Sequence, residues 1–133
     1  MSRSVRDLVT EYLDAVGEKR FDRLEELVHP DASFGGTPKI ETTGSGPFVD
    51  GFRHLGPIID RIAIRNLIVE EDAAFVLYDL VTSTEVGPVL CGEYLTTRDG
   101  LISSSTLIFD WRRWPEVMQQ LQQRVLAPAV SKT

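Results

Sequence analysis

The chain has 133 residues, of which 42% are hydrophobic and 26% charged, a composition typical of one globular domain with a core of its own. Its 20 acidic and 14 basic side chains give a net charge of −6, which argues against nucleic acid or an anionic membrane as a partner. The sequence predicts neither a secretory signal nor a membrane span, because no charged N-terminal segment precedes an apolar run and no run approaches 18 apolar residues. A cytoplasmic location is therefore expected.

Cysteine and histidine are scarce, which limits the chemistry that the chain can perform. Cys91 is the only cysteine, so no intrachain disulfide is expected, and its place in an apolar run favours a buried, inert thiol. The two histidines, His29 and His54, lie on separate predicted elements, so no metal site is expected. The Gly44-Ser45-Gly46 stretch lacks the following Lys-Ser/Thr of a phosphate-binding loop, and we expect no cofactor.

Two helices are predicted near the N-terminus. Residues 4–16 carry apolar side chains at helical spacing on one stripe that includes Tyr12, and Ser2 or Ser4 can cap the start. Residues 22–28 predict a second, short helix that His29-Pro30 should stop. A short strand over 31–34 and a glycine-rich rim loop over 35–46 follow, with room for a short strand at Ile40.

A third helix is predicted to begin at Pro47, with Phe48 and Phe52 on its apolar side and His54 beside that stripe. Residues 62–70 predict a strand. A C-terminal helix begins at Trp114-Pro115, and Pro128 is expected to end it.

Between them, residues 73–84, 89–98 and 101–112 read as three strands, because β-branched and aromatic residues are dense there and turn signals separate the runs. Side chains alternate between faces along a strand. We assign Leu77 and Asp79 in the first strand to the inside, and Tyr78 to the outside. Asp79 stands in an otherwise apolar row, so its carboxylate lies at a mouth, in an ion pair or in a site.

The element order predicts an α+β fold in which a curved antiparallel sheet wraps around N-terminal helices as a cone. We expect one domain over 1–133, with a core over about 5–114 and the C-terminal helix over about 115–127. The open end of such a cone is a natural site for a small molecule. The predicted lining comprises Tyr12, Phe48, Phe52, Leu77, Asp79, Val81, Glu93, Leu95, Ser105, Leu107 and Phe109.

Several short motifs occur in an order and spacing that resemble a known superfamily. They include Val9 to Ala15 in the first helix, Phe21 to Leu27 in the second, and His29-Pro30-Asp31-Ala32-Ser33-Phe34. The stretch from Gly46 to Phe52, the turn from Glu71 to Val76 and the hairpin at Asp99-Gly100-Leu101-Ile102 complete the set. From Val5 to Trp114 the chain resembles the nuclear transport factor 2-like, or cystatin-like, superfamily, and within it the SnoaL-like proteins related to polyketide cyclases and ketosteroid isomerases. This resemblance implies the fold, not an activity.

Two enzymes of the superfamily show what the resemblance implies for single residues. In ketosteroid isomerase, the oxyanion-hole tyrosine matches Tyr12 and the protonated aspartate lies on the strand of Glu93, but Gly35 and Gly36 stand where its general base is found. In limonene epoxide hydrolase, the first acid of the catalytic set matches Asp79. Leu77 and Leu107 replace the other two members.

Two functions remain open. The first is a cofactor-independent isomerase, cyclase or dehydratase that uses Asp79, Tyr12 and Glu93, with His54 as a further candidate, on a small apolar substrate. The second is a non-catalytic binding or dimerisation module of the same fold. Pairing of Asp79 with Arg53 or Arg65 at a rim would favour the second. In both cases we expect a homodimer formed through the outer face of the sheet, assigned to Val76, Tyr78, Leu80, Thr106 and Ile108.

Overall fold

The computed structural model describes residues 4–36 and 40–130. The helices and strands, in chain order, are α1 (Val5–Gly17), α2 (Phe21–Glu26), β1 (Val28–Gly36), β2 (Ile40–Thr43), α3 (Ser45–Leu55), the 3-10 turn η1 (Gly56–Ile58), β3 (Ile59–Glu70), β4 (Ala73–Thr82), β5 (Pro88–Arg98), β6 (Leu101–Phe109) and α4 (Trp114–Val130). None of the helices in these described ranges is long and apolar enough to cross a membrane.

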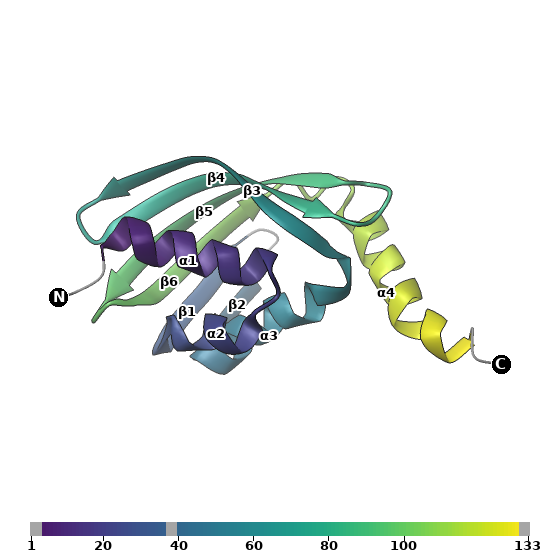
Figure 1. Ribbon diagram of the computed structural model, residues 1–133, viewed down its shortest axis with the longest axis horizontal. Coiled ribbons are helices and arrows are strands. Elements are labelled where there is room, and N and C mark those ends of the chain that lie inside the picture. The colour runs from purple at the N-terminus through teal and green to yellow at the C-terminus, as the bar shows by residue number, and fades with distance from the viewer. Residues whose placement is uncertain (1–3, 37–39, 131–133) are drawn as a thin grey trace.

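The strands form one sheet in the order β2-β1-β6-β5-β4-β3. All neighbours are antiparallel except β1 and β6, which are parallel. The sheet is curved and arches over α1, while α2 and α3 lie below its β1–β2 end (Figure 1). The prediction of an α+β fold with a curved sheet around N-terminal helices is therefore confirmed.

Helix α1 fills the concave side of the sheet. It begins where the Ser4 hydroxyl accepts a hydrogen bond from the backbone N–H of Asp7, which satisfies one of the free donors at a helix start. Its apolar stripe is completely buried at Val9 and Tyr12. The predicted helix and its Ser4 cap are thus confirmed to within one residue.

The segment after α2 differs from the sequence-based expectation. His29-Pro30 was expected to form a turn, but both residues lie inside β1, which begins at Val28. Residues 35–36 are strand where a rim loop was expected, the short strand considered at Ile40 is present as Ile40–Thr43, and α3 begins at Ser45, ahead of the expected start at Pro47. Backbone hydrogen bonds explain the difference, because β1 pairs with β2 on one side and with β6 on the other. This pairing keeps the segment in an extended conformation.

The alternation of β4 is the reverse of the assignment from sequence. Val76, Tyr78 and Leu80 face the buried interior, whereas Leu77 and Asp79 lie on the outer face. The outward row that we predicted for dimerisation is therefore wrong on β4, although Thr106 and Ile108 on β6 are exposed as expected. Both faces of β4 are apolar, so hydrophobicity alone did not distinguish them.

Helix α4 closes one end of the fold and projects away from the sheet (Figure 1). Val117 and Leu121 anchor it in the core. Arg124 donates hydrogen bonds to the Ser83 hydroxyl, the Ser83 carbonyl and the Pro57 carbonyl, and Gln120 accepts one from the backbone N–H of Glu85. The helix continues to Val130, so Pro128 does not end it as predicted.

Candidate ligand cavity and buried carboxyl cluster

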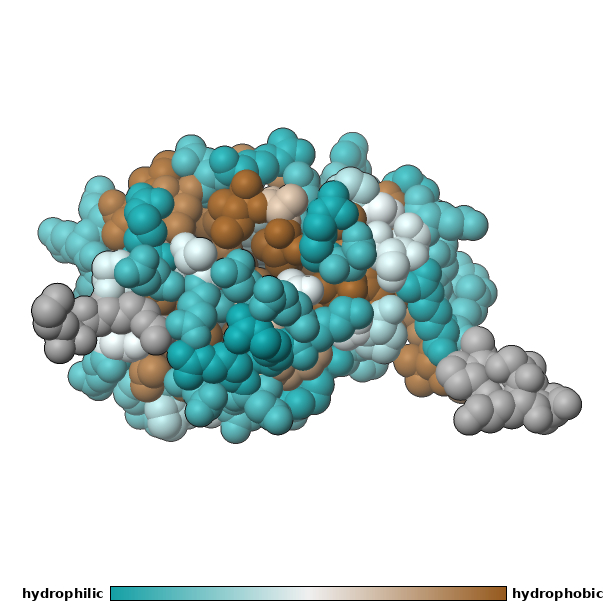
Figure 2. Space-filling model, viewed as in Figure 1, coloured by the Kyte–Doolittle hydropathy of each residue, from teal (hydrophilic) through white to brown (hydrophobic). Residues whose placement is uncertain are grey.

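A cavity of about 230 Å³ lies between the concave face of the sheet, α3 and the first turns of α4. No charged side chain among the described residues lines it. Its wall is formed by Val16, Phe34, Gly36, Thr42, Pro47, Phe48, Gly51, Phe52, Leu55, Ile59, Ile62, Tyr78, Leu80, Cys91, Leu107, Phe109, Trp114 and Met118. Figure 2 shows hydrophobic side chains between α1 and β3, bordered by hydrophilic ones. On the face seen in that view, apolar atoms therefore reach the protein surface.

Aromatic rings shape one wall of the cavity. Phe34 of β1 contacts Phe48 and Phe52 of α3 edge to face, with ring centroids 5.2 and 5.9 Å apart. Tyr12 packs behind the same two rings, at 6.2 Å from each. Phe109 and Trp114 form a second edge-to-face pair at 5.0 Å. Such pairs fix ring orientation, so the wall is a preformed surface.

Beside this cavity, a fully buried carboxyl group is surrounded by hydroxyl groups. Glu93 of β5 is 0% exposed. Its Oε2 atom accepts hydrogen bonds from the Tyr12 hydroxyl at 2.7 Å and the Ser105 hydroxyl at 2.6 Å. Its Oε1 atom accepts one from the Tyr78 hydroxyl at 2.8 Å. Four elements, α1, β4, β5 and β6, thus bring their polar groups to one point.

Burial determines the protonation of this cluster. It raises the pKa of Glu93 above its ordinary value of 4.5, and the hydrogen bonds from Ser105, Tyr12 and Tyr78 offset part of that rise. The pKa values of Tyr12 and Tyr78 are raised well above 10.0, mainly by burial and secondly by the charge of Glu93. The same two causes raise the pKa of the neighbouring Cys91 thiol to about 12. Burial therefore favours the neutral form of every one of these groups.

Tyr78 connects the cluster to the cavity. Of Glu93 and its three hydroxyl partners, it is the residue that lines the cavity. A second polar group comes from Thr42, another lining residue, whose hydroxyl oxygen is buried and has no hydrogen-bond partner among the described residues. A buried hydroxyl without a partner costs about 1–3 kcal/mol. The cavity is thus an apolar space with few polar groups.

The comparisons with known proteins agree with this architecture. The family model for the SnoaL-like domain matches residues 9–105. The chain belongs to the SnoaL-like domain family. No curated protein matches the sequence.

Solved structures similar to this SnoaL-like chain share its fold at low sequence identity. An NTF2-like protein of unknown function from Cytophaga hutchinsonii is 18% identical, with a TM-score of 0.72 over 86% of this chain and 96% of its own. A steroid delta-isomerase from Pseudomonas aeruginosa is 12% identical, with a TM-score of 0.71 over 96% and 94%. A de novo designed protein with a curved β-sheet is 19% identical, with a TM-score of 0.75 over 92% and 98%. At these identities the likeness concerns the fold alone.

The structure of this SnoaL-like domain brings some of the predicted site residues together. Phe48, Phe52, Leu107 and Phe109 line the cavity. Tyr12 and Glu93 are joined directly, and Ser105 bonds to the same carboxyl group. These three residues and Leu95 are buried behind the wall and do not line the cavity themselves.

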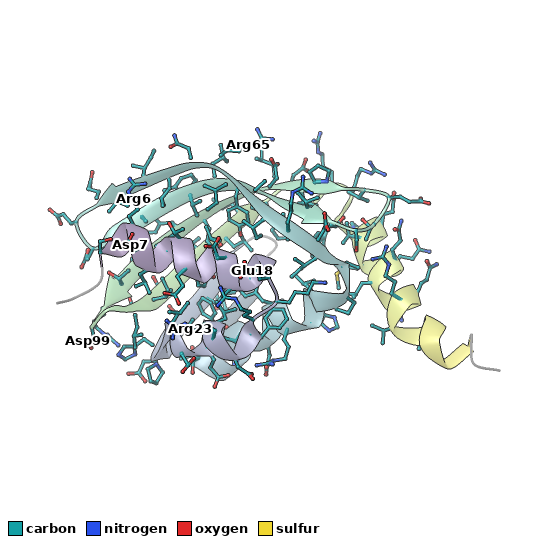
Figure 3. All side chains as sticks on the ribbon, viewed as in Figure 1. Arg6, Asp7, Glu18, Arg23, Arg65 and Asp99 are labelled. Atoms are coloured by element: carbon teal, nitrogen blue, oxygen red, sulfur yellow. The ribbon has the colours of Figure 1, made fainter. Side chains whose placement is uncertain are left out.

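Other predicted site residues lie outside the cavity. Asp79 accepts two hydrogen bonds from Arg65 on the outer face of the sheet, at 2.9 and 3.1 Å, and Figure 3 shows Arg65 on the side opposite α1. Leu77 and Val81 share that outer row. His54 is exposed in the last turn of α3. Asp79, Leu77, Val81 and His54 are therefore corrected from cavity residues to surface or outer-face residues, because the alternation of β4 is reversed and His54 turns away from the apolar side of α3.

The cavity residues that sequence reasoning missed are Tyr78, Leu80, Cys91, Trp114 and Met118. The sequence held no signal for Tyr78, because both faces of its strand are apolar. In the structure Glu93 pairs with Val76, so Tyr78 two residues later faces inward as well. Within the described residues, no group of three or more His, Cys, Asp or Glu side chains is arranged to hold a metal ion.

Proposed function

We propose that this SnoaL-like domain binds a small, mostly apolar molecule in the cavity and does not transform it. The observation that carries the proposal is the composition of the wall, which is almost entirely aliphatic and aromatic. Pockets for small molecules have this character, with a few polar groups that fix orientation. The pairing of Asp79 with Arg65 supports the same reading, because it removes from the cavity the acid on which a catalytic role chiefly rested.

The volume sets the size of the ligand. An apolar cavity of about 150 Å³ holds one benzene molecule. The cavity here measures about 230 Å³, so a molecule with one or two fused rings fits. Indane, a bicyclic hydrocarbon, is a suitable probe.

Filling the cavity tests this proposal. Leu107 lines the cavity on β6, and Ile108, the next residue, lies exposed on the outer face. We expect Leu107→Trp to abolish indane binding measured by calorimetry, because the larger side chain occupies the cavity, and Ile108→Trp to leave the affinity unchanged. Equal affinities in the wild type and both variants, or no binding by the wild type, would contradict a ligand site here.

A second candidate function is proton-transfer catalysis, meaning isomerisation, cyclisation or dehydration without a cofactor. It is favoured by one observation, namely that Tyr78 places a cavity residue in direct hydrogen bonding with a buried carboxyl group whose pKa is raised. In this catalytic alternative, Glu93 would influence the substrate through its hydrogen bond with Tyr78, and Tyr12 through its hydrogen bond with Glu93. Incubating 1-indanone with the protein in deuterium oxide separates the two candidates. Binding alone leaves 1-indanone, the ketone of indane, unlabelled in deuterium oxide, whereas catalysis accelerates exchange of the hydrogens next to its carbonyl group.

We further propose that the chain forms a homodimer through the outer face of the sheet. Side chains of adjacent strands form an exposed apolar patch there: Ile68 is 57% exposed, Phe75 38%, Tyr94 48%, Leu90 41% and Ile108 57%. Contiguous patches of this kind usually mark interfaces. We expect a dimer in sedimentation velocity at micromolar concentration and a monomer for Tyr94→Arg, with Thr43→Arg on β2 as the charge-matched control. A monomeric wild type would refute the proposal.

A further inference from the structure

We infer that Tyr78 is a hydrogen-bonding group of the cavity in addition to Thr42, and that it donates to a carbonyl oxygen of the ligand whenever Glu93 carries a proton. The inference rests on the proposed function, because it requires the cavity to be a binding site. It adds the chemical class of the ligand, which is a compact apolar molecule with one acceptor oxygen. It also makes the affinity for that ligand depend on the protonation of Glu93, which the ligand does not touch.

The carboxyl group of Glu93 is surrounded by hydroxyl donors. Three hydroxyl groups, from Tyr12, Tyr78 and Ser105, point their hydrogens at one carboxyl group. This arrangement fits an ionised carboxylate, which only accepts. A neutral carboxylic acid carries a hydrogen of its own, and two hydrogens cannot share one oxygen–oxygen contact. A buried acid hydrogen without an acceptor is costly, so the proton of neutral Glu93 is donated to one of these hydroxyl oxygens, and that hydroxyl group directs its own hydrogen elsewhere.

The surroundings decide which hydroxyl group turns. Oε2 already accepts from Tyr12 and Ser105, whereas Oε1 has a single partner, Tyr78. Tyr12 is fully buried behind the rings of Phe48 and Phe52, which offer its hydrogen no acceptor oxygen. Tyr78 alone of the three borders the cavity. The proton therefore belongs on Oε1, from where it is donated to the Tyr78 oxygen, and the Tyr78 hydrogen is released toward the cavity.

The other groups around the carboxyl do not change this result. They are Tyr12 from α1, Tyr78 from β4, Ser105 from β6, and Cys91 on the same strand as Glu93. Burial raises the pKa of Tyr12, Tyr78 and Cys91, so these groups stay neutral while Glu93 titrates. The Cys91 thiol, paired with Tyr78 across the β4–β5 ladder, is a weak acceptor and does not compete with a carbonyl oxygen.

Burial raises the pKa of Glu93 above 4.5, so the neutral acid persists to higher pH than in an exposed glutamate. Below that raised pKa, Tyr78 donates into the cavity and a ketone is favoured. Above it, the carboxylate recovers the Tyr78 hydrogen and the ketone loses its partner. A hydrocarbon of the same shape is indifferent to this change.

The experiment compares 1-indanone with indane by calorimetry from about pH 5 to about pH 9. For the wild type we expect 1-indanone to bind about tenfold more tightly than indane at the low end, the effect of one buried hydrogen bond, and this preference to fall as the pH rises. In Tyr78→Phe the ratio of the two affinities should not change with pH, because the Thr42 hydroxyl does not titrate in this range. Glu93→Gln should keep the ketone preference at every pH, because its amide N–H donates permanently to Tyr78.

Tyr12→Phe is the matched control, since it removes a hydroxyl group from the same carboxyl on the side away from the cavity. We expect it to keep the ketone preference and to move its loss to higher pH, because the carboxylate loses a donor. A ketone preference that still falls with rising pH in Tyr78→Phe, or that is independent of pH in the wild type, would overturn the inference while leaving the cavity as a ligand site. Failure of the wild type to bind either probe would overturn the proposed function together with it.

Discussion

Replacing Glu93 by leucine is expected to lower the free energy of unfolding by an amount on the order of 5 kcal/mol, because each of three buried hydroxyl groups left without an acceptor costs about 1–3 kcal/mol. Leucine is similar in size, so the loss comes from the missing acceptor, not from a void. Small domains are stable by only about 5–15 kcal/mol, so the variant should be close to unfolding. Urea denaturation followed by circular dichroism at neutral pH measures the change.

Two further variants isolate the cause. Glu93→Gln keeps an acceptor oxygen and should cost much less than Glu93→Leu. Adding Tyr12→Phe, Tyr78→Phe and Ser105→Ala to Glu93→Leu removes the donors as well and should recover most of the lost stability, since replacing both sides of a buried hydrogen bond is nearly neutral. If Glu93→Leu were as stable as the wild type, the hydroxyl cluster would not be holding the core together.

Gly36→Ala is expected to lower the free energy of unfolding by about 3 kcal/mol, at the upper end of the usual cost of overpacking. A β-carbon at Gly36 would lie 2.0 Å from the Leu107 carbonyl oxygen and 3.0 Å from its carbon. These are backbone atoms of β6, to which β1 is paired in parallel, so they cannot move aside as a flexible side chain would. Thermal or urea denaturation should show the loss.

Gly51→Ala is the control for this substitution. Gly51 also lines the cavity, but it lies in α3 and a β-carbon there meets nothing within 4 Å. Alanine favours a helix over glycine by about 0.5–1 kcal/mol, so this variant should be slightly more stable than the wild type. Similar effects of the two substitutions would show that Gly36 is not pressed against β6.

The elements with a single strong pattern were predictable from the sequence. Helix α1 has one apolar stripe and a capping serine, and both appear where expected. The hairpin at Asp99-Gly100 is also present, with both residues at positive φ. By contrast, the extended course of β1 through Pro30 depends on β2 and β6, which are distant in sequence, and no local pattern indicates it.

Part of the candidate site was predictable from the sequence, and the part that was not depended on strand pairing. Tyr12 was placed inside by the apolar stripe of its helix and Glu93 by the resemblance to ketosteroid isomerase, and the two are hydrogen-bonded to each other. Asp79 and Tyr78 are adjacent on a strand with two apolar faces, so a shift of one residue in the pairing of β4 with β5 exchanges them. The register in which Val76 faces Glu93 puts Tyr78 inside and leaves Asp79 to pair with Arg65.

The attachment of α4 has a consequence for how such a protein can diversify. The family model ends at residue 105, yet Phe109, Trp114 and Met118 complete the cavity wall beyond it. Helix α4 is fastened by Arg124 and a few buried apolar side chains, while the sheet and α1 form a core without it. Substitutions at Trp114 and Met118 would therefore change the shape of the cavity from positions outside the matched domain, while Val117 and Leu121 keep the helix in the core.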